Sequence, residues 1–220
     1  MNEFLFLITF LFALWLSLVA FKMGRVYLYA YVATMGTITF FLAPMVVNMF
    51  GYAFSISEIF YAAMFLSTDM VSEHYGKKEA KKIIWLAAFV MIIIGILTTL
   101  VVSMNAHSVD IIKPHIQALL AISPRLMIAA FIMFILEQHL DAHIFHRIKE
   151  KTWHEKLWLR NNVSTIIVQS VDVLIFYPLA FYGVYNNLWE LMIMAFVFKI
   201  VMALLDTPFI YLSQKLKTTQ

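Results

Sequence analysis

Long apolar segments alternate with short polar segments along the whole chain. A transmembrane helix needs about 20 consecutive, predominantly apolar residues. Seven segments meet this requirement, namely residues 4–21, 26–50, 56–75, 83–104, 118–140, 162–184 and 190–213. No polar connection between them is long enough to form a soluble domain. The pattern predicts an all-α, polytopic membrane bundle that forms a single transmembrane domain over residues 1–220.

The composition supports lipid as the solvent for most of the surface. Hydrophobic residues make up 63% of the chain and charged residues 13%, compared with roughly 45–50% and about 25% in soluble proteins. The absence of cysteine excludes disulfides, thiolate metal sites and cysteine nucleophiles. The sequence also lacks the G-x-x-x-x-G-K-[ST] loop that binds nucleotide phosphates. We therefore expect neither an enzyme nor a bound cofactor.

Basic residues are distributed unevenly among the polar connections. Thirteen of the 16 lie in every second connection, whereas the intervening connections contain only Lys113. Because cytoplasmic loops are enriched in Lys and Arg, this asymmetry predicts an N-terminus outside and a C-terminus in the cytoplasm. It also explains the net charge of +3 as a topology signal rather than as a surface that binds nucleic acid.

The first apolar segment, residues 4–21, is either a retained helix or a cleaved signal. A signal peptide has positive residues before its apolar core. Here Glu3 precedes the segment and Lys22 follows it. This order favours a retained helix.

Ionisable residues inside the predicted spans point to a function. Each costs at least about 2.5–3.5 kcal/mol at the centre of a transmembrane helix. The spans contain Glu58, Asp69, Glu73, Arg125, Glu137, Asp141, Asp172, Lys199 and Asp206. When Glu73 and Asp141 are set aside as close to the cytoplasm and Glu190 as lying at the outer edge, the spans still contain five acids and two bases. Some acids must therefore be protonated, hydrated or bonded to a ligand, which a solute pathway explains better than ion pairs between helices.

Asp172 and Lys199 are predicted to lie at similar depths. At a rise of 1.5 Å per residue both are roughly 13–18 Å from the outer end of their spans, near the middle of a hydrocarbon core about 30 Å thick. Thr165, Gln169 and Asp172 share one helix face. The sequence therefore predicts a pair between Asp172 and Lys199 next to a polar stripe.

Four separated motifs carry a resemblance to a known family. They are STDMVSEHYGKKEAKK at 67–82, LEQHLDAHIFHRIK at 136–149, WLRNNVSTIIVQSVD at 158–172 and FKIVMALLDTPFIYL at 198–212. Together they resemble the queuosine precursor transporters of the vitamin uptake transporter (VUT) family. The resemblance covers residues 26–215, as a core of six spans. It therefore implies that the helix at 4–21 is an N-terminal addition.

The resemblance implies uptake of a 7-deazapurine base for tRNA modification. Such bases are the nitrile and aminomethyl precursors of queuosine (preQ0 and preQ1) and queuine. The family works without a dedicated ATPase. The preferred base, the energy source and the oligomeric state, including a homodimer, remain open at this stage.

The substrate explains which residue types a site would need. A guanine-like edge presents adjacent N–H donors and one carbonyl, so a carboxylate can accept from it while an amide or a basic group donates to it. The candidates of these types in the matching motifs and spans are Asp69, Arg125, Gln138, Asp141, Gln169, Asp172 and Lys199.

A membrane-embedded metalloenzyme is the alternative function. His139, His143 and His146 are four and three residues apart and share a helix face. Three histidines on one face can bind zinc. No H-E-x-x-H motif supports this function.

Overall fold

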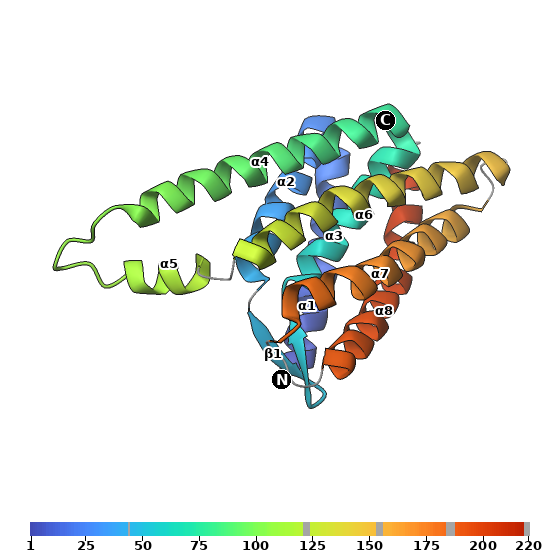
Figure 1. Ribbon diagram of the computed structural model, residues 1–220. Coiled ribbons are helices and arrows are strands. Elements are labelled where there is room, and N and C mark those ends of the chain that lie inside the picture. Colours follow the sequence, from blue (N-terminus) through green and yellow to red (C-terminus); the bar gives the residue numbers. More distant parts are fainter. Residues whose placement is uncertain (44, 121–123, 153–155, 184–187, 218–220) are drawn as a thin grey trace.

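The structure, a computed structural model, describes residues 1–43, 45–120, 124–152, 156–183 and 188–217, with the side chains of all of these except 118–120, 124–127 and 217. Helices dominate the described part (Figure 1). They are α1 (Asn2–Met23), α2 (Arg25–Leu42), α3 (Glu58–Tyr75), α4 (Lys77–Ser103), α5 (Lys113–Leu120), α6 (Pro124–Lys151), α7 (Leu157–Phe181) and α8 (Leu188–Lys217). A hairpin of β1 (Val46–Met49) and β2 (Tyr52–Ser55) separates α2 from α3.

The distribution of polar and apolar side chains is the reverse of that in a soluble protein. Large apolar side chains such as Phe4, Trp85 and Leu174 are exposed on the outside of the bundle, while Asp69 and Lys199 are buried. Burying charge and exposing apolar surface costs free energy in water, whereas lipid solvates the apolar surface. The all-α membrane fold expected from the sequence is therefore present.

Five described helices are long and apolar enough to cross a membrane: α1, α4, α6 from Ile128, α7 and α8 up to Leu216. Helix α2 has 18 residues and would span about 27 Å at 1.5 Å per residue. Helix α3 has the same length and carries Glu58, Asp69 and Glu73.

Helix α3 is polar because it is the central helix of the bundle (Figure 1). It contacts α1, α2, α4, α6 and α8. Twelve of its 18 residues are buried, so its acidic side chains face other helices instead of lipid. This burial explains why α3 can be less apolar than the five helices named above.

The structure corrects the predicted span at 26–50. Its helix ends at Leu42, and Val46–Met49 forms a strand that pairs antiparallel with Tyr52–Ser55. The turn residues Phe50 and Gly51 both have positive φ, as a tight hairpin requires. The apolar run continued into the hairpin because β-branched residues such as Val46 and Val47 suit strands as well as spans. The short helix α5 was not predicted either.

Helix α1 is packed into the bundle rather than attached to its edge. It contacts α2, α3 and α8, and Phe10 and Leu14 are completely buried. The Tyr31 hydroxyl donates a hydrogen bond to the Ala13 carbonyl at 2.6 Å. Asn2 and Glu3 bond the hairpin, because Asn2 Nδ2 donates to the Asn48 carbonyl at 2.9 Å and Phe50 N–H donates to Glu3 Oε1 at 3.1 Å.

Phe10→Ala should therefore destabilise the folded protein by about 3–5 kcal/mol, because it leaves a cavity at a fully buried position. Phe12→Ala is the matched control, since Phe12 lies on the same helix and is 56% exposed. Melting temperatures of the purified variants in detergent measure the difference. Equal melting temperatures would show that α1 does not stabilise the bundle.

Candidate functional site

Lys199 lies at the centre of a buried polar cluster, in the half of the bundle near the β-hairpin. Its neighbour Phe198 packs against Phe54 of β2, with ring centroids 4.5 Å apart. Lys199 Nζ donates to Asp172 Oδ2 at 2.6 Å and to Gln169 Oε1 at 2.8 Å. The two acceptors are three residues apart on α7 and so lie on one face. The predicted pair between Asp172 and Lys199 is confirmed.

Glu58 completes this group, and the sequence analysis did not include it among the site residues. Its Oε2 lies 3.0 Å from Lys199 Nζ, and Tyr177 OH donates to its Oε1 at 3.4 Å. Glu58 is the first residue of α3, where the helix dipole favours a negative charge. The sequence analysis counted Glu58 among the acids inside the spans but gave it no role in a site. We call Lys199, Asp172, Gln169 and Glu58 the lysine cluster.

A pocket adjoins the lysine cluster between α3, α7 and α8. Tyr61 closes one side, with its ring centroid 5.4 Å from Lys199 Nζ and its hydroxyl donating to Glu137 Oε2 at 2.8 Å. The lining consists of Glu58, Tyr61, Ala62, Phe65, Thr165, Gln169, Lys199, Met202, Ala203 and Asp206. These side chains leave room for about one water molecule. A larger ligand can enter only if they move apart.

A second buried group contains three acids, and we call Asp69, Asp141 and Asp206 the aspartate cluster. They come from α3, α6 and α8 and are 1%, 2% and 2% exposed. The carboxyl groups of Asp69 and Asp141 lie within hydrogen-bonding range of each other. Asn161 Nδ2 donates to Asp206 Oδ1 at 2.9 Å. Asp206 also lines the pocket, so the two clusters are neighbours.

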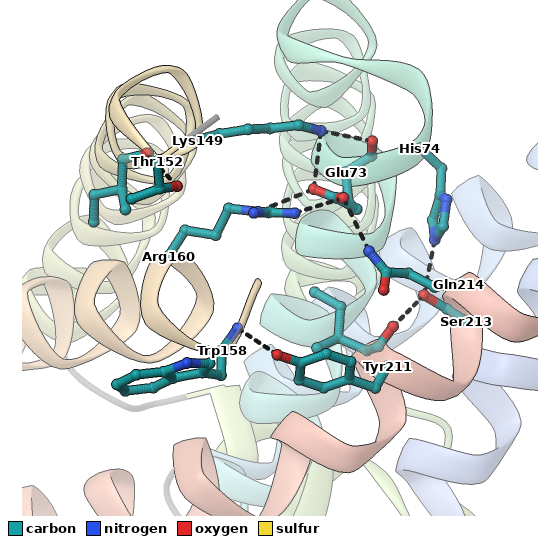
Figure 2. A network of polar contacts seen from close by, with 11 residues as sticks. Glu73, His74, Lys149, Thr152, Trp158, Arg160, Tyr211, Ser213 and Gln214 are labelled. Atoms are coloured by element: carbon teal, nitrogen blue, oxygen red, sulfur yellow. Dashed lines mark hydrogen bonds and ion pairs between the residues drawn. The ribbon is translucent and has the colours of Figure 1, made fainter. Parts of the chain in front are cut away.

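A third polar group closes the end of the bundle opposite the hairpin (Figure 2). Arg160 of α7 donates through Nη2 to Glu73 Oε1 at 2.6 Å and through Nε to Oε2 at 3.1 Å. Lys149 Nζ of α6 lies 2.9 Å from Glu73 Oε2, and Gln214 Nε2 of α8 donates to Oε1 at 3.3 Å. We call these four residues the arginine network. It joins α3, α6, α7 and α8.

The three groups follow one another along the helices. On α8, seven residues separate Lys199 from Asp206, which is about 10 Å at the helical rise. On α3, Asp69 is 11 residues beyond Glu58, about 16 Å, and Glu73 is about 6 Å further. One small ligand therefore cannot contact both the lysine cluster and Asp69 in this conformation.

The structure thus divides the residues proposed from the sequence. Gln169, Asp172 and Lys199 meet at the pocket, whereas Asp69 and Asp141 meet in the aspartate cluster. Gln138 is 1% exposed, and its amide has no hydrogen-bond partner among the described residues. The side chain of Arg125 lies outside the part of the chain that the structure describes.

The three histidines of the metalloenzyme alternative make separate contacts. His139 Nδ1 lies 2.9 Å from the Ile135 carbonyl, and His143 Nδ1 lies 3.3 Å from Lys77 Nζ. His146 is buried, and its Nε2 has no partner among the described residues. Within these residues no three His, Cys, Asp or Glu side chains are arranged to hold a metal ion. This alternative finds no support.

Comparisons with known proteins agree with the resemblance carried by the motifs. Residues 55–213 match the model of a family described as "Putative vitamin uptake transporter". The chain is similar to the "Probable queuosine precursor transporter" of Bacillus subtilis (strain 168), with 28% identity over 77% of this chain and 76% of that protein. It is also similar to the "Queuosine precursor transporter" of Escherichia coli (strain K12), with 24% identity over 64% of this chain and 62% of that protein. No solved structure matches the chain significantly.

Proposed function

Because the chain belongs to the vitamin uptake transporter family, we propose that it imports a queuosine precursor, a 7-deazapurine base, across a membrane. The relatives in Bacillus subtilis and Escherichia coli carry this function in their names. The observation that best supports it here is Lys199, bonded to two carboxylates and an amide beside a buried pocket.

The lysine cluster has the chemistry to bind the polar edge of such a base. Asp172 and Glu58 can accept hydrogen bonds from its adjacent N–H groups, and Lys199 can donate to its carbonyl. Tyr61 and Phe65 line the same pocket, with ring centroids 5.1 Å apart, and offer aromatic faces to a flat ring. We assign substrate binding to this cluster and pocket, so Asp69 and Asp141 are left for another role.

The small pocket implies a conformational change during transport. It has room for about one water molecule, so α3, α7 and α8 must separate to admit a base. The arginine network holds these helices together at the opposite end from the hairpin. We infer that the chain crosses a bacterial inner membrane seven times, with its N-terminus outside, its C-terminus in the cytoplasm and no dedicated ATPase.

Cells that cannot make queuosine precursors provide the test. Expression of this chain, with each base supplied at low concentration, should restore queuosine in tRNA, measured by mass spectrometry of digested tRNA. Cells with an empty vector are the control. If none of the bases restores queuosine although the protein is inserted in the membrane, the proposed function is wrong.

A further inference from the structure

The aspartate cluster has no basic partner within the described residues. Arg160 and Lys149 are the bases on the neighbouring turns of α7 and α6, and both are bonded to Glu73. Asp206 receives a hydrogen bond from a neutral amide, that of Asn161. Three ionised carboxylates without a cation would be very unfavourable in a low-dielectric interior.

The contact between Asp69 and Asp141 requires a proton. Their carboxyl groups are within hydrogen-bonding range, yet neither oxygen of Asp69 has a donor among the described residues. Two ionised carboxylates are both acceptors and repel each other. A single proton on one of them converts the contact into an O–H···O hydrogen bond.

Polar groups with unused bonding capacity lie beside Asp206, the member of the aspartate cluster that lines the pocket. Thr165 is 4% exposed, and its hydroxyl has no partner among the described residues. It lines the pocket together with Asp206, and the space there accepts about one water molecule. The Asn161 side chain is fully buried and donates to Asp206, and its carbonyl oxygen has no partner among the described residues. Asp206 is therefore the side chain through which the pocket and the aspartate cluster adjoin.

We propose that Asp69 and Asp141 form a proton-binding site, and that one proton bound there moves with each substrate molecule. Atoms and charge balance, because a proton from the outer solution converts carboxylate to carboxylic acid and is released inside. Glu137 provides the link to the substrate. It lies four residues before Asp141, about 6 Å along α6, and its carboxyl group faces that of Asp172 in the lysine cluster.

The groups that face the pair from the surrounding helices are few. Asp206 of α8 and Glu73 of α3 act on Asp69 electrostatically. Ser164 of α7 lies near Asp141, and its hydroxyl donates to the Asn161 backbone carbonyl at 3.2 Å. The Asp, Glu, Lys and Arg residues of α1, α2 and α4, which also contact α3, lie near the ends of those helices. The charged groups that face the pair are therefore Asp206 and Glu73.

This inference rests on the proposed function, so its test separates the two. Purified protein is reconstituted in liposomes, and binding of the radiolabelled, uncharged nitrile base is measured first. An outside pH one unit below the inside should then support about tenfold accumulation of the base for one proton per molecule. Collapsing the gradient with a protonophore should abolish the accumulation.

Asp69→Asn and Asp141→Asn keep the size of the side chain, and the new amide can donate to the remaining carboxylate. Both variants should exchange labelled for unlabelled base at equal pH, yet accumulate none with the gradient. Infrared spectra should lose the C=O band of a buried protonated carboxyl in these variants. Asp110→Asn, at an exposed acid, is the control and should behave as wild type.

Each outcome has one meaning. If wild type binds no base, the proposed function fails. Three other results would contradict the proton site while the proposed function stands. They are binding of the base with no effect of a pH gradient, accumulation that requires a sodium gradient instead, and normal accumulation by the Asn variants.

Discussion

Replacing Lys199 by methionine should abolish uptake of the base. The substitution removes the donor to Asp172, Gln169 and Glu58 and leaves two buried carboxylates without a cation. Breaking such a buried pair typically costs about 3–5 kcal/mol, so the amount of folded protein should fall as well. Uptake of labelled base and the level of protein in the membrane are measured together. Lys81→Met, at an exposed lysine, is the control.

Two further variants separate binding from folding at the lysine cluster. Asp172→Asn keeps the shape of the side chain but replaces one of its two acceptor oxygens by an NH₂ donor. The protein should therefore insert normally, and its affinity for the base should fall at least about tenfold, or roughly 1.4 kcal/mol. Combining Asp172→Asn with Lys199→Met removes both charges and should restore much of the stability, but not uptake. Near-normal uptake by the double variant would make this pair structural.

Arg160→Met should produce a large loss of stability. Arg160 is completely buried, and its guanidinium bonds both oxygens of Glu73. Its loss leaves Glu73, among the described residues, with Lys149 and Gln214 and should cost about 3–5 kcal/mol. The melting temperature of purified protein in detergent reports this loss.

Two substitutions serve as comparisons for Arg160→Met. Arg147→Met removes an exposed arginine near the C-terminal end of α6 and should leave the melting temperature almost unchanged. Arg160→Lys keeps the charge but cannot bond both carboxylate oxygens in the fork geometry of arginine, so an intermediate value is expected. An unchanged melting temperature for Arg160→Met would contradict a stabilising role for the network.

The structure explains how a membrane interior holds more acids than bases. Lys199 bonds both Glu58 and Asp172, while the tyrosine hydroxyl of Tyr61 donates to Glu137. Asp206 accepts from an amide. Asp69 has no donor for either oxygen among the described residues. The surplus acids therefore adjoin other carboxyl groups, Asp69 that of Asp141 and Glu137 that of Asp172.

The sequence by itself determined the class of fold and the pairing of Asp172 with Lys199. Runs of about 20 apolar residues can be stable only as helices in lipid, and the helical rise placed Asp172 and Lys199 at one depth. Four motifs indicated the family. These inferences succeeded because hydropathy and helical periodicity are local properties that neighbouring residues along the chain define.

Tertiary structure alone decided how the polar residues are grouped. The start of α3 depends on the hairpin at Val46–Ser55, which pairs through backbone hydrogen bonds that apolar patterning does not reveal. Asp69 met Asp141 rather than Lys199 because α3 and α6 pack in a register set by side chains from several helices. The order of residues in the sequence shows which side chains share a face of one helix. Which faces of different helices meet depends on how the whole helices pack together.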